Sequence, residues 1–227
     1  MYLSGMETLL TVAFFLVPYL LGSISAAVII SRGLYRKDIR NLGSNNAGST
    51  NMFRELGLKA GVLTQVIDIG KGSLAAAIPY FLLWWLPQYP HSLSHLDMEF
   101  QSILAGMMAV IGHIYPVYFG FRGGKGINTL LGMMLVTNWL AALICIIAWV
   151  LILYLTRYVA IASMGGVLTY PIFLVVFAVM QSEDPNWLLT AGGCGMFLLV
   201  VYTHRSNIAR LRKGLEDKNP WFEGRVQ

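Results

Sequence analysis

Long apolar runs are the feature that most limits what this chain can fold into. A helix needs about 20 mainly apolar residues to cross the roughly 30 Å hydrocarbon core of a bilayer. Six runs are predicted to do so: Leu9–Ile30, Ala60–Leu86, Ser102–Phe119, Trp139–Leu155, Val159–Met180 and Trp187–Thr203. A seventh run, Ile127–Val136, would cover only about 15 Å as a helix. The pattern predicts an all-α, polytopic membrane protein.

Composition supports a membrane protein over a soluble one. Only 12% of the residues are charged, about half the fraction of a typical soluble domain. The net charge of +5 would suggest nucleic acid in a soluble protein, but in a membrane protein it reports topology and contact with anionic lipid. No nucleic-acid partner is expected.

The distribution of charge decides how the short seventh run is interpreted. If Thr137 and Asn138 form a turn and the short run counts as a crossing, every Lys and Arg except Lys71 falls on one side of the membrane. The opposite side then carries only acidic residues: Glu7, Asp97, Glu99, Glu183 and Asp184. Basic loops stay in the cytoplasm. We therefore predict seven transmembrane helices, one of them short, with the N-terminus outside and the C-terminus cytoplasmic.

The chain lacks signs of further domains or of a metal centre. Cys145 and Cys194 lie in separate apolar runs, and the four histidines are scattered. No basic residue precedes the first apolar run, so a cleaved secretory signal is not expected. Residues 1–227 are predicted to form one integral membrane domain, with a basic cytoplasmic tail at 204–227.

Three polar stretches lie on the predicted cytoplasmic side. The first, Arg40–Arg54, combines glycines, small hydroxyl side chains, amides and two guanidiniums. Glycine lets backbone N–H groups converge on an anion, and Ser, Asn and Arg side chains add donors. A phosphate-binding loop is the functional interpretation, and a solvated connection between two helices is the alternative.

The second stretch comprises Gly112–Pro116 and Gly120–Gly126 and leads into the short apolar run. A lysine in a glycine-rich turn at a helix N-terminus favours an anion, because free N–H groups and the positive end of the helix dipole meet there. The spacing is not that of a Walker A loop, which needs Gly where Phe119 stands. A tight interfacial turn with a snorkelling lysine is the alternative.

The third stretch, Tyr202–Arg210, closes the last apolar run. On a continuing helix His204 and Asn207 share a face, because they are three residues apart. The alternative is a basic segment that binds anionic lipid. Within a predicted span, Asp68 and Lys71 can pair and so reduce the cost of their charges, either as a structural pair or in a functional role.

The three stretches resemble, in order and position, the motifs of the PlsY family of bacterial acyl-phosphate:glycerol-3-phosphate acyltransferases. The segments that carry the resemblance are GSNNAGSTNMFRELG, GHIYPVYFGFRGGKG and HRSNIARLRKG. It covers nearly the whole chain. It implies a multi-pass enzyme of the bacterial inner membrane, with its active site on the cytoplasmic side, that moves a fatty acyl group from acyl phosphate to the 1-hydroxyl of sn-glycerol 3-phosphate. The products would be lysophosphatidic acid and phosphate, in the first acylation step of phospholipid synthesis.

The resemblance also implies roles for individual residues. Catalytic roles fall on Ser44, His204 and Asn207; substrate contacts on Ser44, Asn51, Arg54, Gly123, Gly124, Lys125, Gly126 and Thr129; and supporting roles on Asp68, Lys71 and His113. The implied partners are acyl phosphate, glycerol 3-phosphate, membrane lipids and the soluble enzyme that makes acyl phosphate, without a metal or a cofactor. Two positions depart from the family pattern, since Ser206 replaces a Glu and Asn45 replaces a Gly.

The chemistry of an acyl phosphate sets what the protein must supply. This mixed anhydride already has a good leaving group, so positioning and electrostatic stabilisation are the main requirements. We expect the glycerol hydroxyl to attack directly, with His204 or a substrate phosphate oxygen accepting its proton. A Ser44 nucleophile with a histidine base is the rival mechanism. A transporter for an anionic solute and a structural protein with a basic face are the non-enzyme alternatives, although the repeats common in transporters are absent.

Overall fold

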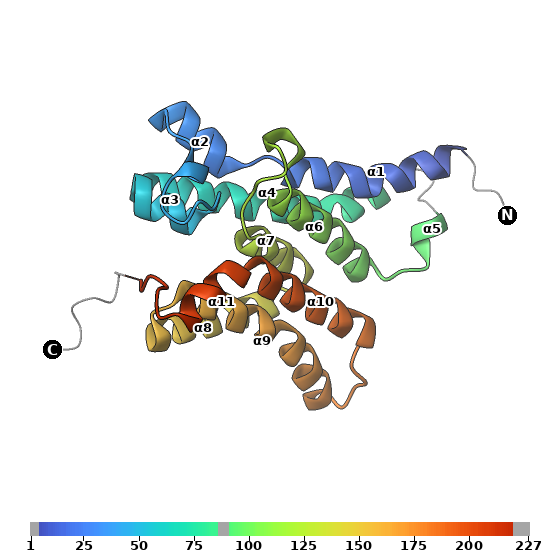
Figure 1. Ribbon diagram of the computed structural model, residues 1–227. Coiled ribbons are helices and arrows are strands. Elements are labelled where there is room, and N and C mark those ends of the chain that lie inside the picture. The colour runs from blue at the N-terminus through green and yellow to red at the C-terminus, as the bar shows by residue number, and fades with distance from the viewer. Residues whose placement is uncertain (1–4, 86–90, 220–227) are drawn as a thin grey trace. The chain divides into compact units, whose positions relative to one another are not determined.

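The computed structural model describes residues 5–85 and 91–219, and every regular element in these ranges is helical. The chain divides into two compact units, Met1–Thr137 and Asn138–Gln227 (Figure 1). Each is described by itself below.

The first unit packs its helices around α4 and α6. Its elements are α1 (Gly5–Gly22), α2 (Ala26–Tyr35), η1 (Ile39–Asn41), α3 (Ser49–Leu56), α4 (Leu58–Trp85), α5 (His91–Ser94), α6 (Met98–Ile114), η2 (Val117–Phe119) and α7 (Ile127–Thr137). The α4 helix contacts α1, α6 and α7, and α1 also lies along α6 (Figure 1). Residue 86, at the end of the second predicted span, lies outside the described residues.

Helices α4 and α7 approach each other until their backbones touch. A Cβ at Gly72 would collide with the carbonyl oxygen of Thr129, and one at Gly132 would collide with that of Ile69. The Ser73 hydroxyl donates to the Gly132 carbonyl at 2.9 Å. Small residues and interhelical hydrogen bonds of this kind hold helices together in a bilayer, and here they fix the short α7 helix, which begins next to the glycine-rich turn.

The first predicted span is interrupted. The sequence predicts one helix over Leu9–Ile30, but α1 ends at Gly22 and α2 begins at Ala26. The Lys71 ammonium donates to the Ile24 carbonyl at 2.9 Å, inside the break. A backbone carbonyl in a membrane needs such a partner once it leaves a helix. The Lys71 ammonium on α4 therefore reduces the energetic cost of this break.

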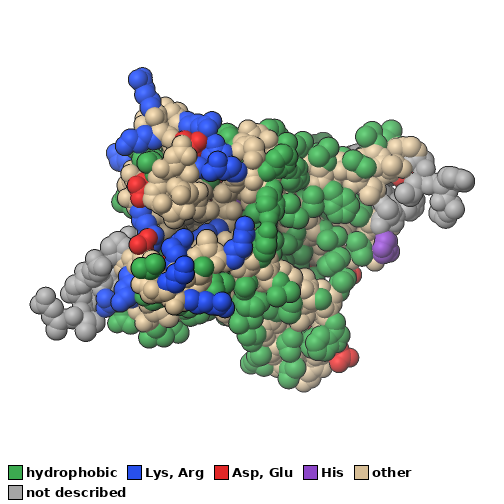
Figure 2. Space-filling model, in the orientation of Figure 1, with side chains coloured by type: hydrophobic (Ala, Val, Ile, Leu, Met, Phe, Trp, Pro, Cys, Tyr) green, Lys and Arg blue, Asp and Glu red, His purple; other side chains and the backbone are tan. Residues whose placement is uncertain are grey.

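Basic side chains gather at one end of the first unit, over α2, α3 and the second polar stretch (Figure 2). The exposed members are Arg32, Arg36, Lys37, Arg54, Lys59 and Arg122. Away from this end, large apolar side chains such as Val66 and Phe81 on α4 are exposed. An apolar surface that ends in a basic patch is typical of a membrane protein near one membrane–water interface.

The second unit contains α8 (Trp139–Thr156), α9 (Val159–Met180), α10 (Trp187–Thr203) and α11 (Arg205–Arg212), with α9 in contact with both α8 and α10. A helix break lies at the position of the predicted turn, since α7 ends at Thr137 and the Asn138 side chain caps α8 by accepting from the Ala141 amide at 3.0 Å. An Asn side chain in this position satisfies an amide left open at the start of a helix.

The last apolar run does not continue straight into the tail. Helices α10 and α11 differ in direction by 59°, whereas the shared face of His204 and Asn207 was predicted on a continuing helix. His204 is the residue at the bend, and its Nδ1 lies 2.8 Å from the carbonyl oxygen of Val200. The imidazole thus adds a hydrogen bond to a carbonyl that also accepts from the His204 amide and the Thr203 hydroxyl, each at 3.0 Å.

The described helices make this a multi-pass membrane protein. Five segments are long and apolar enough to cross a bilayer, and the bent pair α10 and α11 would be a sixth. The α7 helix is apolar but has only 11 residues.

Candidate functional site

The first polar stretch is organised around the buried amide of Asn51. Its Nδ2 donates to the carbonyl oxygens of Ile39, Leu42 and Asn46 at 3.2, 2.9 and 3.1 Å. Its Oδ1 accepts from the Ser44 amide at 3.1 Å. One side chain on α3 therefore shapes the whole loop between η1 and α3, a role that the local sequence pattern does not indicate.

The loop presents its polar side chains outward from this hub. Ser44 in the loop is exposed, and so is Arg54 on the following α3 helix. Gly43 and Asn45 have φ values of +51° and +57°, in the left-handed region that Gly adopts freely and that Asn tolerates better than most residues. The departure from the family pattern at Asn45 is thus compatible with the backbone found here.

In the second stretch, the glycines fold the chain back onto the end of α6. The amides of Gly123 and Gly124 donate to the carbonyls of Ile114 and His113 at 3.2 and 3.1 Å. A Cβ on Gly123 would collide with the His113 carbonyl, and one on Gly124 with the His113 ring. These glycines are required by close approach, and they place the half-buried Lys125 just before the N-terminus of α7.

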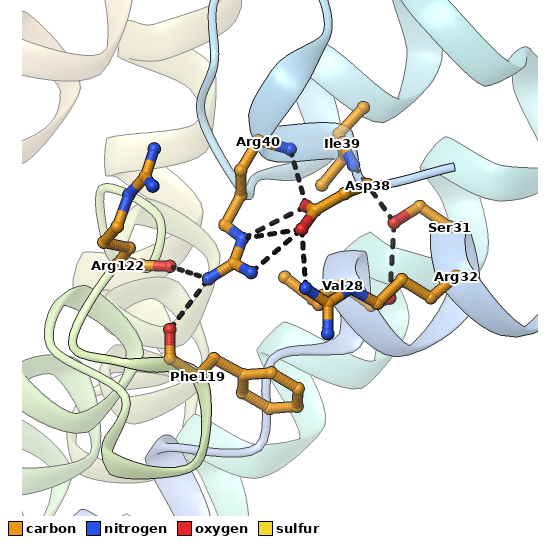
Figure 3. Close-up of polar contacts among 8 residues, drawn as sticks. All are labelled: Val28, Ser31, Arg32, Asp38, Ile39, Arg40, Phe119 and Arg122. Atoms are coloured by element: carbon orange, nitrogen blue, oxygen red, sulfur yellow. Dashed lines mark hydrogen bonds and ion pairs between the residues drawn. The ribbon is translucent and has the colours of Figure 1, made fainter. Parts of the chain in front are cut away.

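The structure brings the first and second stretches together. The Asn128 Nδ2 on α7 donates to the Ser49 hydroxyl at the start of α3, at 2.9 Å. The Arg40 guanidinium in η1 donates to the Phe119 carbonyl at 2.7 Å (Figure 3). The two predicted anion-binding loops are therefore held against one another within the first unit.

Three buried ionisable side chains lie behind the glycine-rich turn. The predicted ion pair of Asp68 and Lys71 is confirmed, with 2.8 Å between Oδ1 and Nζ. His113 joins it, with its Nδ1 3.4 Å from the same Asp68 oxygen. Because the His113 ring and carbonyl both touch the turn, this cluster supports the turn from within. Thr129, at the start of α7, is also buried, and its hydroxyl makes no hydrogen bond within the part of the chain that the structure describes.

The third stretch, in the second unit, holds two buried polar side chains. Since the Val200 carbonyl can only accept, Nδ1 of His204 carries the proton of the neutral ring and Nε2 is the basic nitrogen. The Asn207 Nδ2 donates to Glu216 Oε1 at 2.6 Å. Ser206 is exposed while His204 and Asn207 are buried, so Ser206 faces away from these two side chains.

Three residues with structural importance for these stretches were missed as site residues: Arg40, Asn128 and Glu216. Arg40 and Asn128 bind partners more than 75 residues away in the sequence, so no local pattern identifies them. Glu216 follows the third stretch closely, but nothing in its spacing distinguishes it from a solvated tail residue. Within residues 5–85 and 91–219, no group of three His, Cys, Asp or Glu side chains is arranged to hold a metal ion.

Comparison with known proteins identifies the family. The model of a family described as glycerol-3-phosphate acyltransferase matches residues 12–214. A glycerol-3-phosphate acyltransferase from Salinibacter ruber is 40% identical over 213 residues, covering 92% of each chain. One from Lactiplantibacillus plantarum is 37% identical over 201 residues, covering 88% of each chain.

Solved structures agree with this result. The crystal structure of PlsY (YgiH), an integral membrane glycerol 3-phosphate acyltransferase, in its glycerol 3-phosphate form is similar with a TM-score of 0.77 and 34% identity, over 91% of this chain and 94% of that one. Its lysophosphatidic acid form gives a TM-score of 0.74 and 31% identity over the same shares. The present chain therefore belongs to the glycerol-3-phosphate acyltransferase family.

Proposed function

We propose that this member of the glycerol-3-phosphate acyltransferase family transfers a fatty acyl group from acyl phosphate to the 1-hydroxyl of sn-glycerol 3-phosphate. The products are lysophosphatidic acid and inorganic phosphate, and the reaction is the first acylation of bacterial phospholipid synthesis. Membership of an enzyme family sets aside the transporter and structural alternatives considered from the sequence.

The observation that carries the proposal is the pairing of two donor-rich loops in the first unit. Both substrates bring a phosphate group. Loops built around Asn51 and around Gly123 and Gly124 are fixed to each other through Asn128 and Arg40. Arginine and lysine contribute charge-assisted hydrogen bonds to phosphate, and we assign Arg54, Lys125 and the Ser44 hydroxyl to the two phosphates.

In the proposed reaction the glycerol 1-hydroxyl oxygen bonds to the acyl carbon, and the bond from that carbon to the phosphate oxygen breaks. Phosphate leaves with the electron pair, and the hydroxyl proton passes to His204 or to a phosphate oxygen of the donor. The basic Nε2 set by the Val200 contact supports His204 as acceptor. Lys125 stabilises charge on the departing phosphate.

We place both units in one integral membrane acyltransferase domain, residues 1–227, in the bacterial inner membrane. It would have seven crossings, with α7 counted as one, the N-terminus outside, and the active site and the tail at 204–227 cytoplasmic. The basic end of the first unit supports this orientation. A soluble enzyme that makes acyl phosphate would deliver the donor from the cytoplasm.

Single cysteines test the orientation after Cys145 and Cys194 have been replaced. A cysteine at Lys37 or Lys213 should react with an impermeant reagent only from the cytoplasmic side. A cysteine at Asp97 or Glu183 should react only from outside. Labelling of Lys37 and Asp97 positions from the same side would overturn the orientation.

The reaction itself is tested with purified protein in lipid nanodiscs. Palmitoyl phosphate and glycerol 3-phosphate should yield lysophosphatidic acid and phosphate in equal amounts, while palmitoyl-CoA and palmitoyl-acyl carrier protein should not serve as donors. Equal turnover with palmitoyl-CoA would contradict the donor assignment. A burst of phosphate release without glycerol 3-phosphate would favour a covalent Ser44 intermediate instead of direct attack.

A further inference from the structure

We propose that Arg40 is a positioning residue that holds the turn at 119–125 in place. Through the turn and Lys125, it sets the affinity for the acyl phosphate. The effect on affinity rests on the proposed function, whereas the effect on the turn does not. Arg40 stands in the first polar stretch, but the turn that it holds belongs to the second.

The guanidinium connects a carboxylate to two backbone carbonyls. Its Nε and Nη2 donate to the Asp38 carboxylate at 3.1 and 2.9 Å. Its Nη1 donates to the Phe119 carbonyl at 2.7 Å and to the Arg122 carbonyl at 3.5 Å (Figure 3). Only a planar group with several fixed donors can make both sets of bonds at once.

The anchor for this connection is itself well fixed. Asp38 also accepts from the Arg40 amide at 3.0 Å, which caps η1, and from Arg32 at 2.7 Å. The Arg40 and Asp38 side chains are only 12% and 17% exposed, whereas the Arg32 side chain is 55% exposed. Arg40 is therefore the more buried partner of Asp38, and Arg32 is the solvated one.

Both groups stay ionised because each stabilises the other. The hydrogen bond from the Arg40 side chain holds the pKa of the Asp38 carboxyl well below its usual range, against the opposing effect of burial. The same bond raises the pKa of Arg40. The Asp38 and Arg40 pair is thus a permanent charged clamp at neutral pH.

The clamp acts where the turn needs restraint. Phe119 ends η2, and Arg122 directly precedes Gly123, Gly124 and Lys125. The two carbonyls held by Arg40 bracket Gly120, whose φ of +66° lies in a region that glycine enters and leaves easily. Without Arg40 the Phe119 and Arg122 carbonyls lose these bonds to the first stretch, and the position of Lys125 then depends on the Gly123 and Gly124 amide bonds to the end of α6.

The decisive experiment compares Arg40→Gln with Arg122→Ala. Both remove one positive charge near the turn, but Arg122 contributes its backbone carbonyl to the clamp and so keeps the contact as alanine. In Arg40→Gln we expect amide hydrogen exchange in 119–125 to accelerate about tenfold or more and KM for palmitoyl phosphate to rise about tenfold, the loss of one charge-assisted hydrogen bond. The value of kcat should change less, because the turn holds the phosphate before and during reaction. Arg122→Ala should behave like the wild type.

Arg40→Lys separates position from charge. A lysine keeps the charge but cannot bridge the carboxylate and the carbonyls, so its exchange and KM should stay close to those of Arg40→Gln. Full rescue by lysine, or an equal rise in KM in Arg122→Ala, would show that charge alone matters and overturn the proposal. Unchanged exchange in Arg40→Gln would overturn it as well. If the wild type transfers no acyl group, the proposed function fails, but the exchange measurement still decides whether Arg40 holds the turn.

Discussion

The glycine-rich turn of the first unit and the third stretch of the second unit each contact a carboxylate–arginine pair. The first pair binds backbone carbonyls, whereas the second binds a side chain. In the first unit, Asp38 fixes Arg40, and the arginine then reaches backbone carbonyls. In the second, Glu216 accepts from Arg210 at 2.7 Å, and the carboxylate reaches the Asn207 side chain directly. One pair positions a loop, and the other positions a single functional group.

This difference changes what a substitution removes. In the first unit, Ser44 and Arg54 are exposed and the fold of the loops depends on Asn51 and on glycines. In the second, His204 and Asn207 are buried and take part in the network that fixes them. Substitutions of site residues in the first region should therefore lower activity with little change in stability. Substitutions in the second region should lower both.

The largest effect is expected at His204. His204→Ala removes the proposed proton acceptor and should lower kcat by about 100-fold or more. It should also lower the melting temperature, because the buried imidazole and its hydrogen bond to the Val200 carbonyl are lost. The exposed Ser206→Ala is the matched control and should keep both activity and melting temperature. Full activity in His204→Ala would leave a donor phosphate oxygen as the only proposed acceptor.

A smaller effect, without loss of stability, is expected in the first region. Lys125→Ala and Arg54→Ala each remove a charge-assisted phosphate contact of about 1.5 to 3 kcal/mol, which is roughly 10- to 150-fold in kcat/KM. Their melting temperatures should stay near that of the wild type. A large drop in melting temperature for both variants would erase the contrast between the two regions.

Glu216 tests whether the third stretch depends on its carboxylate. Glu216→Ala removes the partner of Asn207 and should lower kcat by about tenfold, the equivalent of about 1.4 kcal/mol. Glu216→Gln keeps an oxygen that can accept from Asn207 and should keep most of the activity, although the ion pair with Arg210 is lost. Equal losses in both variants would mean that the ion pair, and not the Asn207 contact, matters.

The smallest effect concerns acid stability in the first region. Because the pKa of Asp38 is lowered in the folded protein, its pairing adds stability above the ordinary carboxyl pKa near 4. That stability is lost as the pH falls toward the lowered value. Asp38→Asn should therefore melt below the wild type at neutral pH, by an amount equivalent to about 1 kcal/mol, and the difference should shrink below pH of about 4. A difference that grows with acidity would contradict the assigned ion pair.

The sequence alone determined the helical, membrane-embedded class of this protein and the identity of its polar stretches. Hydropathy is a local property, so the runs that became α4, α8 and α9 could be located within a few residues. The helix break at Asn138 was also predictable, because charge placed a boundary there and Asn is a good helix cap. The pairing of Asp68 with Lys71 followed from a spacing of three on one helix.

Only the tertiary structure decided which distant groups support those stretches. The break at Ile24, the clamp from Arg40 to Phe119 and the contact of Asn128 with Ser49 all use partners far away in the sequence. Two of the three end on a backbone carbonyl, which every residue possesses, so the identity of the acceptor residue carries no information. Hydrogen bonds to the backbone specify a position in space, and that position exists only once the helices have packed.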